Sequence, residues 1–227
     1  MTHTLPAIIP KKKTQLEEEM KLVSTFAPLV QIDICDGVFV PVKTWPYNGV
    51  DVEYFEELKH EDAGWPEWEE TDIELHLMIQ NPEIVLLDWI HTGVASIVVH
   101  IETVETSDIM QQIIDTCRKY TISIGIALKL STDISRIESF VEQIDFIQCM
   151  GSDKLGFHGV PLDPRAIEKI KTLRSLYPER IIAIDIGVTE ETAQELIDAG
   201  ANKLIVGGII LSAENPQEVY SYLSSLE

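Results

Sequence analysis

Short apolar stretches alternate with longer amphipathic stretches along the whole chain. Between residues 30 and 35, apolar side chains alternate strictly with Gln31, Asp33 and Cys35, a period of two that is typical of a β-strand. Residues 13–26 instead carry apolar side chains three and four positions apart, which predicts a helix. The two patterns then recur in turn, so the chain is predicted to repeat a strand-then-helix unit.

Eight such units can be counted. The predicted strands cover residues 5–10, 30–35, 72–78, 96–100, 121–128, 144–150, 180–185 and 201–206. The predicted helices cover residues 13–26, 50–58, 81–91, 107–119, 133–141, 163–176, 189–199 and 215–226. Asn81 before Pro82 is a typical helix start, and Ser107 is expected to cap the fourth helix.

Regular alternation of strands and helices implies a parallel sheet. Eight units in 227 residues favour an α/β fold in which residues 1–227 form one (β/α)₈ TIM barrel. A doubly wound open sheet is the alternative. It is disfavoured because no glycine-rich fingerprint follows the first strand.

The composition is that of a globular protein, with 45% hydrophobic residues and no apolar run of membrane-spanning length. The first residues lack the basic and apolar regions of a signal peptide. The three cysteines are odd in number and widely spaced, so we expect reduced thiols and a cytoplasmic protein.

Acidic residues outnumber basic ones by 38 to 17, which gives a formal charge of −21. This charge argues against nucleic acid or an anionic membrane as a partner. An anionic ligand would need local backbone amides to hold it. Many of the acidic residues lie between 51 and 74, where an acidic insertion near 59–71 also carries Trp65 and Trp68. We expect this segment to be solvated, with the tryptophans holding it down or contacting a partner.

Polar side chains gather where the predicted strands end. Strand two provides Asp33, strand three His76 and strand seven Asp185, and active sites of (β/α)₈ barrels lie at the carboxyl ends of the strands. Imidazole and carboxylates together suit zinc, manganese or iron. We therefore predict a divalent metal site, the alternative for His76 being an interior histidine satisfied by hydrogen bonds. His100, with Glu102 just after it, ends strand four.

Glycines follow the last three strands. They allow the backbone to approach a ligand closely and to direct N–H groups at it, although any one of them alone is more often a turn residue. Together they predict a phosphate site made of Gly156, Phe157, His158, Gly159, Gly187, Gly207 and Gly208.

These stretches resemble the ribulose-phosphate 3-epimerase family. The similar segments are Asp33-Ile-Cys-Asp-Gly-Val-Phe-Val-Pro41, His76-Leu-Met-Ile-Gln-Asn-Pro82, Gly156-Phe-His-Gly159, Ile184-Asp-Ile-Gly-Val188 and Val206-Gly-Gly-Ile-Ile-Leu211. They span nearly the whole chain in the order found in the family.

The resemblance implies an isomerase of carbohydrate metabolism, in the pentose phosphate pathway, that epimerises a phosphorylated ketose. Asp33 and Asp185 correspond to the acid/base pair, which acts through a metal-stabilised enediolate. The implied ligands of the divalent metal ion (zinc, iron or manganese) are Asp33, His76, Asp185 and Gln31. Met78, Cys35 and His100 are expected to contact the phosphorylated sugar, and a homo-oligomer is expected.

The sequence also departs from the family pattern. Gln31 replaces a histidine ligand, Ala7 a serine, and Ile186 the first glycine after the strand-seven aspartate. Val42 and Val160 replace an asparagine and a glutamine. A phosphosugar-binding barrel that is non-catalytic or has a different specificity is therefore the alternative. A lyase or decarboxylase ranks third, because its usual lysine could come only from Lys129.

Overall fold

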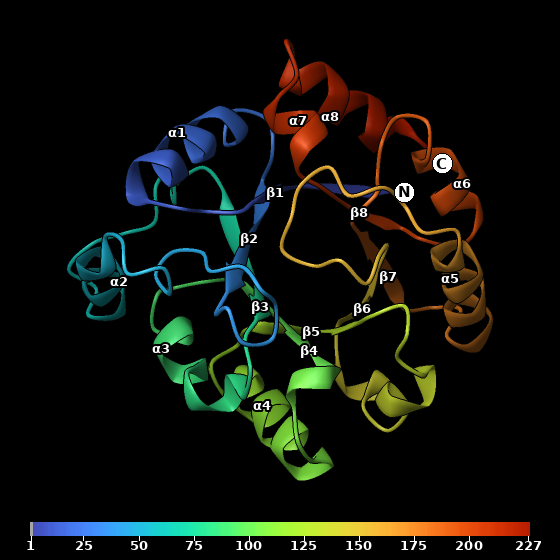
Figure 1. Ribbon diagram of the computed structural model, residues 1–227, viewed down its shortest axis with the longest axis horizontal. Coiled ribbons are helices and arrows are strands. Elements are labelled where there is room, and N and C mark those ends of the chain that lie inside the picture. The colour runs from blue at the N-terminus through green and yellow to red at the C-terminus, as the bar shows by residue number, and fades with distance from the viewer. Residues whose placement is uncertain (1) are drawn as a thin grey trace.

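The computed structural model describes residues 2–227 and contains a closed barrel of eight parallel strands. The strands follow one another around the barrel in sequence order, and the last pairs with the first (Figure 1). They are β1 (His3–Ile8), β2 (Leu29–Cys35), β3 (Asp72–Met78), β4 (Ser96–His100), β5 (Ser123–Leu128), β6 (Phe146–Met150), β7 (Ile181–Asp185) and β8 (Lys203–Val206). All eight predicted strands are present, and the predicted single (β/α)₈ architecture is confirmed.

The helices form a ring around the strands (Figure 1). They are α1 (Lys13–Val23), α2 (Val52–Lys59), α3 (Leu86–Ile90), α4 (Ser107–Lys119), α5 (Arg165–Leu176), α6 (Ala193–Asp198), α7 (Gly208–Leu211) and α8 (Pro216–Ser225). Short 3₁₀ turns lie at Pro82–Ile84, Ile101–Thr103, Ile134–Ile137 and Val141–Gln143. The one-turn helix α7 was not predicted from the sequence.

Three local predictions were wrong. Residues 133–141 form no α-helix, because the Asp133 carboxylate accepts the Ser135 N–H at 2.8 Å and starts a tight 3₁₀ turn instead. Asn81 adopts a left-handed conformation at φ 54° and caps nothing with its side chain, so the helix after β3 is divided into a 3₁₀ turn and the short α3. The cap of α4 is Thr106, whose hydroxyl accepts the Ile109 N–H, and not Ser107.

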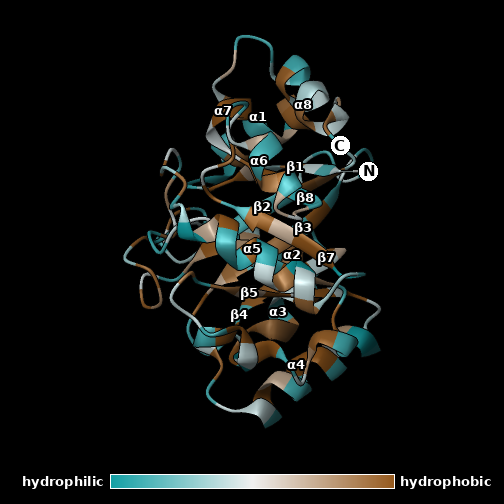
Figure 2. Ribbon diagram, turned by 90° about the vertical axis from the view of Figure 1, so that its right-hand side faces the viewer, coloured by the Kyte–Doolittle hydropathy of each residue, from teal (hydrophilic) through white to brown (hydrophobic). Residues whose placement is uncertain are grey.

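Two apolar layers explain the closed barrel. Alternate residues of every strand point outward and pack against the helices in the larger layer. The inward-pointing residues form a smaller layer that fills the barrel, including Leu5, Val98, Phe146 and Ile205. Figure 2 shows brown strands enclosed by helices whose outer faces are teal. Polar side chains at inward positions therefore stand out against an apolar interior.

The acidic segment after α2 is held by one of its two tryptophans. Trp65 is buried, packs edge-on against Trp45, and donates its indole N–H to the Thr92 carbonyl at 2.9 Å. Trp68 is 63% exposed. Trp65 thus fixes the segment to the aromatic cluster below it, while Trp68 remains on the surface.

A buried ion pair lies in the barrel interior, below the polar residues at the strand ends. Lys203 Nζ lies 2.8 and 2.7 Å from the two carboxylate oxygens of Glu74, and 3.7 Å from the Phe146 ring centroid. Both side chains of the pair are less than a tenth exposed. Each charge is therefore desolvated and depends on the other for compensation.

Replacing one member of this pair should destabilise the barrel more than replacing both. Lys203→Met leaves the Glu74 carboxylate buried without a partner and should lower the free energy of unfolding by about 3–5 kcal/mol. Adding Glu74→Leu to Lys203→Met should recover most of that loss. Urea denaturation of the two single variants and the double variant measures this coupling. If the loss in the double variant equals the sum of the losses in the two single variants, the pair is not coupled.

Candidate active site

Inward-pointing polar residues of three strands meet at the carboxyl end of the barrel. His76 Nδ1 lies 3.0 Å from Asp33 Oδ1 and 3.5 Å from Asp185 Oδ2. One potential ligand atom from each residue lies within 4.8 Å of the others. Asp33, His76 and Asp185 are all buried, at 5%, 0% and 8% exposure. The structure therefore brings together the three residues that the sequence analysis selected.

Two glutamine amides complete this cluster. Gln31 donates from Nε2 to Asp33 Oδ1 at 2.9 Å, and Gln148 Nε2 lies 3.4 Å from Asp185 Oδ2. Both amides are fully buried, and their carbonyl oxygens have no hydrogen-bond partner among the described residues. Gln148 was missed in the sequence analysis. Its position, two residues before Met150 on the inward side of β6, is the signal that could have identified it.

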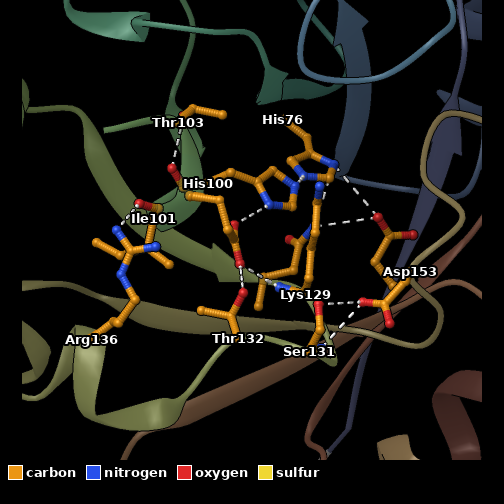
Figure 3. Close-up of polar contacts among 12 residues, drawn as sticks. His76, His100, Ile101, Thr103, Lys129, Ser131, Thr132, Arg136 and Asp153 are labelled. Atoms are coloured by element: carbon orange, nitrogen blue, oxygen red, sulfur yellow. Dashed lines mark hydrogen bonds and ion pairs between the residues drawn. The ribbon is translucent and has the colours of Figure 1, made fainter. Parts of the chain in front are cut away.

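His100 lies behind the cluster. Its ring is fully buried and lies beside that of His76, with the ring centroids 5.0 Å apart (Figure 3), and His100 is not among the residues that line the cavity. Cys35 is also fully buried, with its sulfur 4.0 Å from that of Met78. Of the three predicted substrate contacts, the structure places only Met78 on the cavity wall and the other two beneath it.

A cavity of about 1260 Å³ opens above the cluster. Asp33 and Asp185 reach it, whereas His76 and Gln31 lie below its surface and do not line it. The loop after β6 crosses this end of the barrel in yellow in Figure 1. The two aspartates are thus the cluster members that a bound molecule can touch.

The predicted phosphate residues all line the same cavity. A Cβ atom added to Gly187, which has φ +78°, would lie 2.5 Å from the Leu162 backbone, so only glycine fits there. A Cβ added to Gly207 would lie 2.4 Å from His158 Nδ1, which shows how closely that imidazole covers the backbone after β8. Lys11 lines the cavity as well and was missed in the sequence analysis.

The cluster has too much negative charge for its surroundings. Burial raises the pKa of the Asp185 carboxyl well above its ordinary value, and the neighbouring charge of Asp33 raises it further. Burial by itself would lower the pKa of His76, but the hydrogen bond to Asp33 and the charges of Asp33, Asp185 and Glu74 together raise it. Two close carboxylates therefore require a shared proton, a protonated imidazole or a cation.

The residues fit a divalent cation. Two carboxylates and one imidazole converge, and the unpartnered Gln31 carbonyl oxygen is an available fourth donor. Such a set has more oxygen than nitrogen, which suits manganese or iron at least as well as zinc.

Ile186 directly after Asp185 has an unusual backbone. Its φ is +79°, a region that β-branched residues rarely adopt. Holding a non-glycine residue in such a conformation costs on the order of 1–3 kcal/mol. The strain lies at the edge of the cavity, since Ile186 itself lines it.

The chain is similar in sequence to a family of known enzymes. The model of the ribulose-phosphate 3-epimerase family matches residues 4–211. A ribulose-phosphate 3-epimerase of Schizosaccharomyces pombe is 27% identical over 96% of this chain and 90% of its own length. The enzyme of the same name from Aquifex aeolicus is 28% identical over 88% of this chain and 85% of its own.

Solved structures support the fold. A 3-hexulose-6-phosphate synthase of Salmonella typhimurium superimposes with a TM-score of 0.69, at 16% identity over 99% of this chain and 97% of the other. An orotidine 5'-phosphate decarboxylase of Pyrococcus horikoshii gives 0.64, at 16% identity over 97% of each chain. At these identities the likeness extends to the barrel alone. Within residues 2–227, the helices are too short or too polar to cross a membrane.

The strain at Ile186 predicts an unusual tolerance to glycine. Ile186→Gly should change the free energy of unfolding by less than about 1 kcal/mol, because relief of strain offsets lost packing and added chain entropy. The control is Ile184→Gly, two residues earlier on β7, where the side chain is fully buried and φ is negative, and it should lose more than about 3 kcal/mol. Urea denaturation measures both. A comparable loss in the two variants would contradict the strain at Ile186.

Proposed function

The chain belongs to the ribulose-phosphate 3-epimerase family, and from this membership we propose that it epimerises a phosphorylated ketose by transfer of a proton between two aspartates. The observation that carries this proposal is the selective access to the cavity. Of the buried polar cluster, only Asp33 and Asp185 line the cavity in which a substrate would lie.

The two carboxyl groups supply the acid and the base. One ionised aspartate removes the proton from the carbon next to the substrate carbonyl, and the other, protonated, returns a proton to the opposite face. The configuration of that carbon is then inverted. A buried like-charged pair with a raised pKa suits this task, because one member is held protonated while the other is ionised.

The proposed ligands of a divalent cation are Asp33, His76, Asp185 and the Gln31 carbonyl oxygen. When bound, the cation supplies positive charge that stabilises negative charge on the substrate oxygens. His76 and Gln31 hold their positions from below the cavity surface. Gln31 also donates a hydrogen bond to Asp33 and so orients that carboxylate toward the cavity.

The substrate phosphate is proposed to bind the backbone after β6, β7 and β8. The predicted glycines line the cavity there, and His158 and Lys11 add side chains that can carry positive charge. Met78 and Met150 provide an apolar wall. Cys35 supports this wall from beneath, through its contact with Met78.

A phosphosugar-binding barrel without turnover is the second candidate. It is favoured by Gln31 in place of the family's histidine, Ala7 in place of serine, and the strained Ile186 beside Asp185. A lysine-dependent lyase has less support. Lys129 lies over the Phe39 ring at 4.0 Å and is outside the lining of the cavity that the described residues form.

A proton-exchange assay tests the proposed activity. The protein is incubated with ribulose 5-phosphate and Mn²⁺, Fe²⁺ or Zn²⁺ in deuterated buffer, and exchange at C3 is followed by NMR. Asp185→Asn should lower exchange by about 10²–10⁴-fold, the usual contribution of an acid or base. The surface variant Asp108→Asn is the control and should keep full activity. Phosphosugar binding without exchange under every metal would instead support the binding protein.

The glutamine ligand predicts an altered metal preference. Gln31→His should bind Zn²⁺ about tenfold more tightly or better, because an imidazole is a stronger zinc ligand than an amide and tenfold needs only about 1.4 kcal/mol. Titration of chelator-stripped protein against a competing zinc indicator measures this change. Unaltered zinc affinity would exclude Gln31 from the ligand set.

Three further expectations stay predictions. They are a homo-oligomer, a cytoplasmic location and a role in the pentose phosphate pathway.

A further inference from the structure

Hydrogen bonds continue from His76 to His100 and Glu102, which do not line the cavity. His76 Nε2 lies 2.9 Å from His100 Nε2, and Figure 3 shows the two rings next to each other. On its other side, His100 Nδ1 lies 3.1 Å from Glu102 Oε2. Both imidazoles are fully buried. Every nitrogen of the two rings is therefore engaged by protein groups.

We call the hydrogen-bonded series His76, His100 and Glu102 the relay. Its end at Glu102 is fixed by hydrogen-bond donors. Glu102 Oε1 accepts the backbone N–H of Lys129 at 2.8 Å and the hydroxyl of Thr132. Its other oxygen faces His100. Three groups thus converge on one carboxylate, where the N–H can only donate and the hydroxyl donates to the same oxygen. This is the environment of an ionised carboxylate, which accepts hydrogen bonds and donates none.

Neighbouring side chains cover His100 and fix its backbone. The Phe39 ring packs on His100 at a centroid distance of 4.8 Å, and Lys129 Nζ lies over the outer face of that ring. The Thr103 hydroxyl donates to the His100 carbonyl at 2.8 Å and fixes its backbone. Because both imidazoles are fully buried, their hydrogen bonds have to be satisfied within the protein.

These donors and acceptors permit only one direction of hydrogen-bond donation, from His76 to His100 and from His100 to Glu102. Because Glu102 accepts, the hydrogen between it and His100 is on His100 Nδ1. A neutral imidazole carries only one N–H, so His100 Nε2 accepts and His76 Nε2 must donate. With its hydrogen held on Nε2, His76 has Nδ1, which faces Asp33 and Asp185, as the nitrogen that can give a lone pair to a cation between them.

We propose that Glu102 and His100 are positioning residues that fix His76 in the tautomer whose Nδ1 can ligate a divalent cation. A hydrogen bond on the second nitrogen commonly orients a metal-bound histidine, and here it passes through another histidine before it reaches the carboxylate. The inference rests on the proposed metal site. It assigns His100 a role behind that site in place of the predicted substrate contact.

Glu102→Gln tests the direction of the relay while keeping the size of the side chain. The Lys129 N–H and Thr132 hydroxyl should keep the new amide oxygen, which turns its NH₂ group toward His100. His100 Nδ1 must then accept, its hydrogen moves to Nε2, and His76 has to carry its own hydrogen on Nδ1. The variant should therefore reverse both tautomers.

The readout is the ¹⁵N chemical shift of each imidazole nitrogen in metal-free, histidine-labelled protein. In the unsubstituted protein, His76 Nε2 should carry a hydrogen, and in Glu102→Gln it should be bare, with the hydrogen on Nδ1. The affinity for Mn²⁺, measured by electron paramagnetic resonance titration, should fall by about 10–100-fold in the variant. Glu105→Gln removes an exposed charge three residues away and is the matched control, with both readouts unchanged.

A second pair of variants keeps the test decisive if Glu102→Gln does not fold. His100→Gln can accept from His76 through its oxygen and donate to Glu102 through its NH₂ group, so it should preserve the His76 tautomer. His100→Leu offers no acceptor to His76 Nε2 and should abolish the preference for a hydrogen on that nitrogen.

An unsubstituted protein in which His76 Nε2 is bare, or a Glu102→Gln protein in which His76 Nε2 still carries a hydrogen, would overturn the proposal. Absence of Mn²⁺, Fe²⁺ and Zn²⁺ binding by the unsubstituted protein would overturn the proposed metal site. The two failures are distinguishable because the tautomers are read in metal-free protein.

Discussion

The repulsion between two buried carboxylates is the constraint on which the rest of the site depends. Asp33 and Asp185 both approach the same nitrogen, Nδ1, of His76, at the floor of a cavity and almost out of reach of water. Burying like charges this close is strongly unfavourable unless positive charge or donors compensate. His76 and the amides of Gln31 and Gln148 supply part of this compensation. The negative charge that remains requires a proton or a cation, and the proposed reaction uses both.

The barrel makes this costly arrangement possible because it separates stability from chemistry. Its outer apolar layer packs strands against helices and does not involve the inward positions. The ion pair of Glu74 and Lys203 shows that the interior accepts charge where a partner is built in. At the carboxyl ends of the strands the negative charge is only partly compensated, and the cavity of about 1260 Å³ opens there. Local instability is thereby confined to the mouth, where a ligand can relieve it.

The sequence predicted most of the site for two reasons. The two-residue period of a strand determines which side chains point inward, and the barrel topology determines where the strand ends lie. Asp33, His76 and Asp185 occupy inward positions at strand ends, and a closed parallel barrel must bring such residues together. The depth of each side chain could not be predicted. His100 has the same parity and the same end of the barrel, yet stacking on His76 removes it from the cavity. Gln148 was overlooked since an amide carries no charge to mark it.

A net charge of −21 and an anionic substrate are compatible because the charges are unevenly placed. The acidic segment that follows α2 is solvated and lies at the left of the barrel in Figure 1, whereas α6 and α7, after β7 and β8, lie at its right and top. Exposed charges act over a Debye length of about 8 Å at physiological salt, so solvent screens most of that field. Backbone amides with Lys11 and His158 would then dominate at the proposed phosphate site, whose residues line the cavity. On this proposal, local geometry and not overall charge decides which anions enter the barrel.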